Sequence, residues 1–165
     1  MRLSLPLGDE RFTDLLRAWG VPYSFGAGKP SDGLNAWPDG AKGSQRGIGW
    51  DCSGLAQAAC VRLGTLDSKA IDRTAQSLCS LFKREVARGD EQLGDLAFYG
   101  PNFSTIVHVT VVVAPGIILG ANGGHSMTNG DDPSAFVRLD RIGYRLDLRT
   151  IRRPEREHAP AVAVA

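Results

Sequence analysis

The feature that most constrains the fold of this chain is a change of pattern near residue 95. Before that point, apolar residues recur at helical spacing in three segments, residues 9–19, 51–64 and 74–83. After it come short runs rich in β-branched residues, which favour strands. Helices followed by strands predict an α+β domain, with the helices packed on a small antiparallel sheet.

The second part of the chain contains five predicted strands. They are the runs at residues 95–100, 106–114, 116–122, 136–139 and 144–151. Pro115 and Gly116 form a turn signal between the second and third runs, so these two are predicted to pair as a hairpin.

A chain of 165 residues has room for one ordinary domain. We assign that domain to residues 1–154. Residues 155–165 carry no pattern that would fix them, so we expect a mobile tail there.

The charges nearly balance, with 19 lysines and arginines against 18 acids and a net charge of +1. Such a chain has no broad field to recruit nucleic acid or an anionic membrane, and neither is expected as a partner. The apolar patch near the N-terminus is broken by Pro6 and is too short for an export signal or a bilayer span. We therefore predict no signal peptide.

Residues 21–49 carry many glycines and prolines and little periodicity, which predicts a long irregular loop. Loops of this length inside compact domains are usually functional or disordered. We expect the glycine-rich part, residues 27–49, to form a wall or lid of the active cleft.

The three cysteines are Cys52, Cys60 and Cys79, and no two of them form a C-x-x-C pair. Neither a disulfide framework nor a structural metal site is therefore expected. Cys52 lies at a predicted helix start, where free amide N–H groups and the helix dipole favour the thiolate. Cys60 and Cys79 are interpreted as structural thiols, and a small buried residue is the alternative for Cys52 as well.

His108 lies within the apolar run IVHVTVVV, where a polar ring indicates a specific structural or catalytic role. On a strand beside the helix it could form a thiolate–imidazolium pair with Cys52, although a structural histidine is the alternative. Alternation predicts that Ile106 and Thr110 share the face of His108, while the intervening valines face the core.

The segment Asp51-Cys52-Ser53-Gly54-Leu55, followed by a helix, by G-D-L-x-F-Y and by His-Val before a β-rich run, resembles the NlpC/P60 peptidases. Upstream, the segment from Val21 to Ala27 is similar to the family's P-Y-x-x-G-G pattern, and Arg73-Thr74 to its R-T or R-S pair. The resemblance covers about residues 21–119 in the family's order.

The resemblance implies a papain-like fold and a cysteine peptidase that cleaves peptide stems of peptidoglycan, with no metal and no organic cofactor. It makes Cys52 the nucleophile and His108 the general base, and it places Tyr23, Asp51 and Ser53 on the substrate side of the cleft. Asp51 could instead serve only as a helix cap, and Tyr23 could be ordinary core. The backbone N–H of Cys52 is the expected oxyanion donor.

One position departs from the family's pattern. The third polar residue that follows the base by about a dozen positions falls here on Gly120. Asn122 lies on the same face of an extended strand and ranks first as the replacement, and His125 ranks second. Both could be loop residues, and a backbone carbonyl or water could also orient His108.

Two other functions stay open on the sequence alone. The first is a papain-like acyltransferase or amidase acting on another small substrate, and the second is an inactive module that binds cell wall or belongs to a phage tail. The segment GANGGHS and residues 144–154 resemble phage and prophage members of the family. We therefore expect the protein in the cytoplasm or carried in a phage-like particle, with phage-tail or other particle proteins as possible partners.

Overall fold

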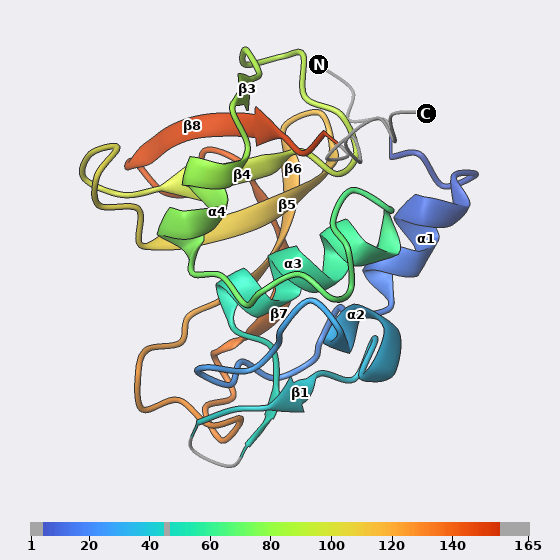
Figure 1. Ribbon diagram of the computed structural model, residues 1–165, viewed down its shortest axis with the longest axis vertical. Helices are drawn as coiled ribbons and strands as arrows, with labels where there is room; N and C mark the ends of the chain where they lie inside the picture. The colour runs from blue at the N-terminus through green and yellow to red at the C-terminus, as the bar shows by residue number, and fades with distance from the viewer. Residues whose placement is uncertain (1–4, 45–46, 156–165) are drawn as a thin grey trace, which may run out of the picture.

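The computed structural model describes residues 5–44 and 47–155. Its helices pack on one face of an antiparallel sheet (Figure 1). The helices are α1 (Glu10–Leu16), α2 (Asp32–Asn35), α3 (Cys52–Arg62) and α4 (Ala75–Leu81). The strands are β1 (Ala41–Lys42), β2 (Ile48–Gly49), β3 (Arg84–Glu85), β4 (Leu96–Tyr99), β5 (His108–Ala114), β6 (Ile117–Asn122), β7 (Phe136–Arg141) and β8 (Leu148–Arg153). The predicted α+β class is confirmed.

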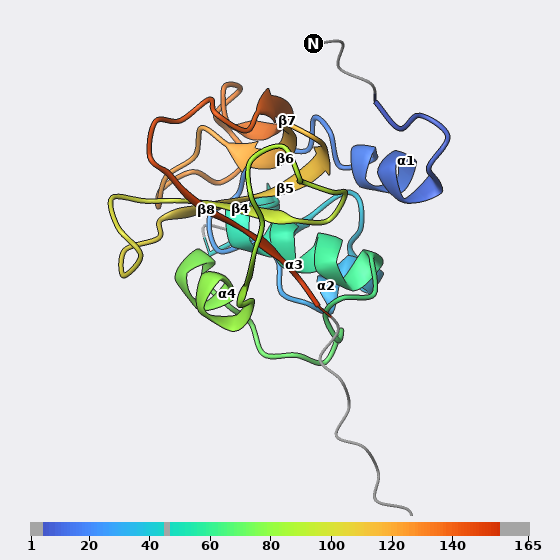
Figure 2. The ribbon, with the colours of Figure 1, turned by 90° about the horizontal axis from the view of Figure 1, so that it is seen from above.

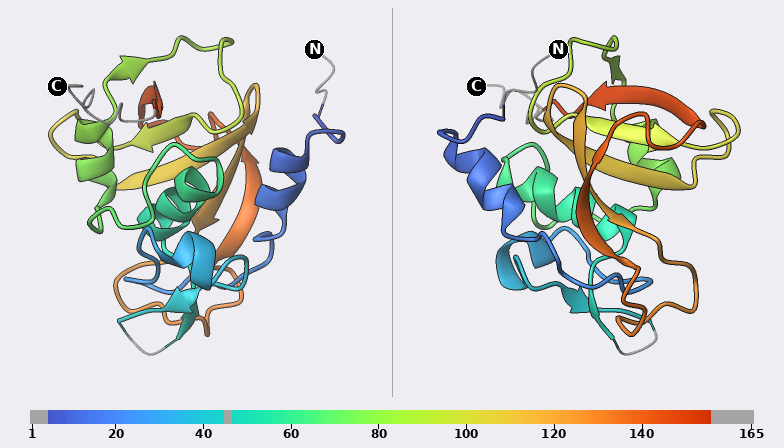
Figure 3. Two further views of the ribbon diagram at one scale, coloured as in Figure 1. Left: turned by 45° about the vertical axis from the view of Figure 1, so that its right-hand side comes forward. Right: turned by 180° about the vertical axis from the view of Figure 1, so that it is seen from behind.

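The main sheet has six strands in the order β3-β8-β4-β5-β6-β7, and every neighbouring pair is antiparallel. The predicted β5–β6 hairpin is present, with Gly116 in its turn at a φ of +77°. After β7 the chain crosses back to pair β8 with β4 and β3 rather than with β7. This return carries the β7–β8 loop across the sheet, as the view from behind in Figure 3 shows.

Helix α3 lies at the centre of the molecule, between the sheet and the segment that contains α2 (Figures 1 and 2). Residues 54–60 are all buried, so the helix has no solvent face over two turns. A side chain at Gly54 would collide with the backbone of Ala27 and Gly28, so glycine lets the loop pass close to the helix. The start of α3 is therefore held on several sides.

The sheet has a smaller apolar core on its other face. Its buried members are Ala97, Tyr99, Val112, Ile118, Ile142 and Ile151. Ile142 and the half-buried Tyr144 belong to the β7–β8 loop, which folds over this face. The loop thereby comes close to the end of the β5–β6 hairpin.

Several local predictions were wrong in detail. The segment 21–49 is not wholly irregular, since it contains α2 and the small β1–β2 sheet. The last strand begins at Leu148 rather than at Tyr144, because residues 142–147 form the connecting loop. Ile106 is buried in the helix-side core and Val107 is 54% exposed, because regular alternation begins only at His108.

None of the helices in the described part of the chain is long and apolar enough to cross a membrane. The predicted tail, residues 155–165, lies outside the described residues except for Glu155, which pairs with Arg84 at 2.7 Å.

Candidate active site

Cys52 is the first residue of α3, and Asp51 caps the helix before it. One carboxylate oxygen of Asp51 accepts hydrogen bonds from the backbone N–H of Gly54 at 2.7 Å and from the hydroxyl of Ser53 at 3.0 Å. The other oxygen accepts from the backbone N–H of Gly26 at 3.0 Å. Asp51 therefore caps the helix and ties the glycine-rich loop to it, while Cys52 stays partly exposed.

His108 is the first residue of β5, on the strand that packs against α3. Its Nε2 lies 2.8 Å from Oδ1 of Asn122, and its ring packs at 5.7 Å from the ring of Tyr99. The hairpin register pairs Val111 of β5 with Leu119 of β6. Three residues further toward the open end of the hairpin, the same register sets His108 opposite Asn122. The sheet thus places the two side chains together although 14 positions separate them in the chain.

Gly120 leaves the space that Asn122 occupies. A Cβ at Gly120 would lie 2.9 Å from Oδ1 of Asn122 and 2.7 Å from Cγ2 of Thr110, and both distances are too short for real contacts. The carboxamide of Asn122 therefore takes the space that a side chain at position 120 would fill.

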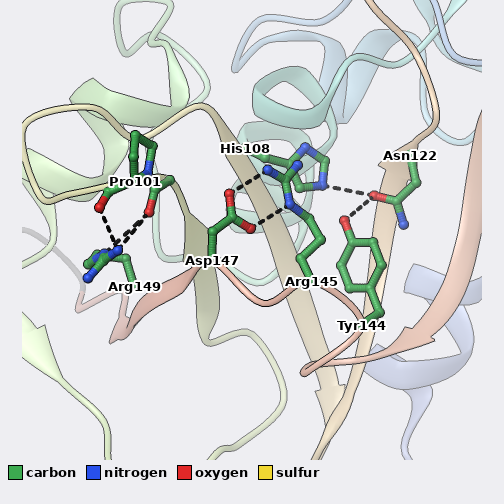
Figure 4. A network of polar contacts seen from close by, with 8 residues as sticks. Pro101, His108, Asn122, Tyr144, Arg145, Asp147 and Arg149 are labelled. Carbon is green, nitrogen blue, oxygen red and sulfur yellow. Dashed lines mark hydrogen bonds and ion pairs between the residues drawn. The ribbon is translucent and has the colours of Figure 1, made fainter.

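Asn122 has two further partners, which the sequence reasoning missed. Its Nδ2 donates to Oδ2 of Asp140 at 2.9 Å, and the hydroxyl of Tyr144 donates to its Oδ1 at 3.1 Å. Figure 4 shows His108, Asn122 and Tyr144 meeting at this oxygen. The local signal for Asp140 was the alternation of charged and apolar residues along residues 136–141.

Two cavities flank Cys52. The first, of about 380 Å³, is lined by Cys52, His108, Asn122, Arg138, Tyr144 and Arg145, among others. The second, of about 400 Å³, is lined by Asp51, Cys52, Ser53, Asp72, Arg73 and Thr74, among others. Tyr23, Cys52 and Val107 line both, so the cleft continues on either side of the thiol. Tyr23, Asp51, Cys52, Ser53, His108 and Asn122 thus all line this cleft, whereas His125 does not.

Ion pairs border the first cavity. Arg145 binds Asp147 through two hydrogen bonds of 2.8 and 2.6 Å (Figure 4). The guanidinium of Arg145 also lies over the ring of Tyr99. In the same figure, Arg149 donates to the carbonyl of Pro101 at 2.6 Å and so ties β8 to the loop that leads to His108.

Burial raises the pKa of the Cys52 thiol to about 12, and the nearby charge of Asp51 acts in the same direction. The backbone N–H groups of Val109, Ser53 and Cys52 itself lower this pKa. The N–H groups at the helix start thus favour the thiolate, as the sequence predicts. The loss of hydration on burial favours the neutral thiol and has the larger effect on the pKa.

Burial also lowers the pKa of His108 to about 4, and the charge of Arg145 lowers it further. The hydrogen bond that His108 donates to Asn122 and the charge of Asp147 raise this pKa. Neither a lone thiolate nor a lone imidazolium is therefore favoured at neutral pH. A proton moving from Cys52 to His108 would create both ions together, and each would stabilise the other.

His125 does not reach His108. The ring Nδ1 of His125 accepts a hydrogen bond from the backbone N–H of Met127 at 3.2 Å. The backbone N–H of His125 donates to the hydroxyl of Thr128 at 3.0 Å. The ring of His125 belongs to an exposed turn. Cys60 and Cys79 are buried and unpaired, and no cluster of metal-binding side chains occurs among the residues the structure describes.

A cysteine at the start of a buried helix, in one cleft with a sheet histidine that an amide holds, is the arrangement of a papain-like cysteine hydrolase. Residues 20–139 match the NlpC/P60 family, and the chain belongs to this family.

Relatives of known name and structure agree with this assignment. Over 107 residues the chain is 35% identical to the peptidoglycan endopeptidase RipB of Mycobacterium tuberculosis, a match that covers 63% of this chain and 39% of RipB. It is 34% identical over 105 residues to the peptidoglycan endopeptidase RipA of the same organism, which covers 62% of this chain and 19% of RipA. The chain thus matches less than half the length of these relatives.

Solved structures show the same fold. The structure of the peptidoglycan hydrolase RipB aligns with a TM-score of 0.58 and 25% identity, covering 88% of this chain and 65% of that one. RipD of M. tuberculosis, described as a non-catalytic NlpC/p60 domain protein adapted to peptidoglycan binding, aligns with a TM-score of 0.56 and 20% identity. That alignment covers 88% of this chain and 98% of RipD, so the fold occurs with and without catalysis.

Proposed function

We propose that this protein is a cysteine endopeptidase that hydrolyses amide bonds in peptidoglycan stem peptides. In this proposal Cys52 is the nucleophile, His108 the general base and Asn122 the residue that orients His108. The observation that carries it is the 2.8 Å contact between His108 and Asn122 in a cleft that Cys52 also lines. The substrate class follows from the names of the relatives, two peptidoglycan endopeptidases.

The hydrogen-bond pattern assigns the steps of the reaction. Since Oδ1 of Asn122 accepts from Nε2 of His108, Nδ1 is the nitrogen left to take the proton of the Cys52 thiol. The thiolate attacks the carbonyl carbon of the scissile amide, and the backbone N–H of Cys52 donates to the developing oxyanion. His108 then gives its proton to the leaving amine, and a thioester remains on Cys52.

Hydrolysis of the thioester completes the cycle. Water enters from the cleft and attacks the thioester carbonyl while His108 takes one of its protons. The C–S bond breaks, His108 returns that proton to the sulfur of Cys52, and the acyl group leaves as a carboxylic acid that ionises in solvent. Because burial disfavours each ion alone, the proton transfer between Cys52 and His108 couples to substrate binding, which excludes water and brings the polarised carbonyl to the thiol.

Tyr23, Asp51 and Ser53 are proposed to line the substrate side of the cleft. Tyr23 lines both cavities beside Cys52, while Asp51 and Ser53 line the second one. The carboxylate of Asp51 is engaged by three hydrogen bonds, so its proposed part is to shape the cleft by holding Gly26 and the helix start.

The test is release of peptides from purified peptidoglycan, followed by mass spectrometry. The wild-type protein should release fragments with new amino termini inside the stem peptide, and Cys52→Ala should release none. Cys79→Ser is the matched control, because that thiol is buried outside the cleft. A wild-type protein that binds peptidoglycan but releases nothing would instead be a binding module.

Asn122 weakens the case for an inactive module. The only sequence feature that favoured inactivity was the glycine at position 120, and Asn122 fills the space of a side chain there. Acyl transfer uses the same thioester, so adding an amine acceptor to the assay separates it from hydrolysis. Action in the cytoplasm or from a phage-like particle, with particle proteins as partners, stays a prediction from the sequence.

A further inference from the structure

The orientation of the Asn122 carboxamide decides which nitrogen of His108 carries the proton. An amide has an oxygen that accepts and a nitrogen that donates, at nearly the same place after a 180° rotation. With Oδ1 toward His108, Nε2 must donate and Nδ1 is free as a base. With the amide reversed, Nε2 would accept from Nδ2 and the proton of the neutral ring would sit on Nδ1.

Asp140 distinguishes the two orientations. Its Oδ2 accepts from Nδ2 of Asn122 at 2.9 Å and from Nε of Arg138 at 2.9 Å. A carboxylate that pairs with a guanidinium only accepts hydrogen bonds. Reversing Asn122 would place Oδ1 against Oδ2 of Asp140, two acceptors at hydrogen-bond distance, with no proton between them.

Burial of Asn122 strengthens the preference for this orientation of its amide. Asn122 is only 2% exposed, so water cannot readily supply the bonds that a reversed amide would lose. Tyr144 adds a second donor to Oδ1, at 3.1 Å, from the loop that follows β7. Asp140 and Tyr144 thus act on opposite ends of one amide.

We propose that Asp140 is a positioning residue for His108: it holds the amide of Asn122 with Oδ1 toward Nε2, and so keeps Nδ1 free to accept the proton of Cys52. This inference rests on the proposed function for its effect on turnover, but the protonation pattern of His108 exists whether or not the protein is an enzyme. The two can therefore be tested apart.

The test compares Asp140→Leu, which removes the acceptor at similar size, with Asp140→Asn. Both hydrogen bonds of Asp140 fall on Oδ2, so an asparagine there can keep an oxygen at that position. Nitrogen-15 NMR of the His108 ring should show the Nε2–H form in the wild type and in Asp140→Asn. Asp140→Leu should show a mixture with the Nδ1–H form. Should the leucine variant not fold, Asp140→Ala replaces it.

Turnover supplies a second reading. In Asp140→Leu, kcat should fall about tenfold with KM changed less than about twofold, since a positioning defect acts on the chemical step. Asp140→Asn should recover kcat to within about threefold of the wild type. The inference is overturned if the leucine variant keeps the wild-type ring form, or if asparagine recovers no more than leucine does. A wild type with the Nε2–H form but no peptide release would overturn the proposed function alone.

Discussion

Asn122 holds the imidazole of His108 from across the β5–β6 hairpin, with 2.8 Å between Oδ1 and Nε2. Both side chains come from neighbouring strands of one sheet, His108 from β5 and Asn122 from β6, so their relative position depends on the sheet rather than on a loop. The predictions below test this pair and the thiol that shares its cleft.

Replacing Cys52 by alanine should abolish hydrolysis and change the free energy of unfolding by less than about 1 kcal/mol, since the side chain is small and partly exposed. Peptide release and thermal unfolding measure the two effects. Cys60→Ser and Cys79→Ser should keep turnover within about threefold, with some loss of stability from a buried hydroxyl. Full activity in Cys52→Ala would remove the proposed mechanism.

Asn122→Ala should lower kcat by about tenfold to a hundredfold with KM little changed, because the amide acts on His108 and not on bound substrate. His125→Ala should leave kcat unchanged, since its ring bonds only within its own turn. Steady-state kinetics of both variants decide the point. The reverse result would make His125 the third member and would contradict the hairpin register.

Gly120→Ala should lower kcat as Asn122→Ala does, because the added Cβ would meet Oδ1 of Asn122 at 2.9 Å. Overpacking against Thr110 should also reduce the free energy of unfolding by about 1–3 kcal/mol. Gly8→Ala is the control, since a Cβ there meets nothing within 4 Å. Unchanged turnover in Gly120→Ala would show that Asn122 can move without loss of function.

Protein stability should rise with pH between about 4 and 6.5 because of His108. Its pKa is lowered from 6.5 to about 4 in the folded state, so the unfolded chain binds more protons in this interval. The stabilisation is fully present above pH 6.5 and is lost as the pH falls toward 4. Burial raises the pKa of Asp51, which acts in the opposite direction.

The measurement is chemical denaturation at several pH values for the wild type and for His108→Gln, because the difference between them isolates His108 from Asp51. The slope of stability against pH should be smaller in the variant. Equal slopes would mean that His108 titrates normally in the folded protein.

Alkylation of Cys52 by iodoacetamide should depend on His108. Burial raises the pKa of the thiol to about 12, so a thiolate at pH 6 requires a partner that takes its proton. The rate at pH 6, followed by mass spectrometry, should fall at least about tenfold in His108→Gln. Equal rates in the two proteins would show that the helix start alone activates the thiol.

The sequence by itself determined the parts that depend on neighbouring residues. Asp51 caps α3, and Thr74 caps α4 through its side chain, because cap residues act within three positions of the helix start. The Pro115-Gly116 turn likewise specified the hairpin that carries His108 and Asn122. These local features were enough to predict the class of fold, and the resemblance to the NlpC/P60 peptidases added the thiol, the base and the first choice of orienting residue.

Only the tertiary structure decided how the orienting amide is itself held. Asp140 and Tyr144 lie 18 and 22 positions after Asn122, and the sequence predicted a strand beginning at Tyr144. Tyr144 reaches Asn122 because β8 pairs with β4 on the far side of the hairpin, which draws the β7–β8 loop over the sheet. Strand order and loop packing are set by burial across the whole sheet, and no local pattern of residues encodes them.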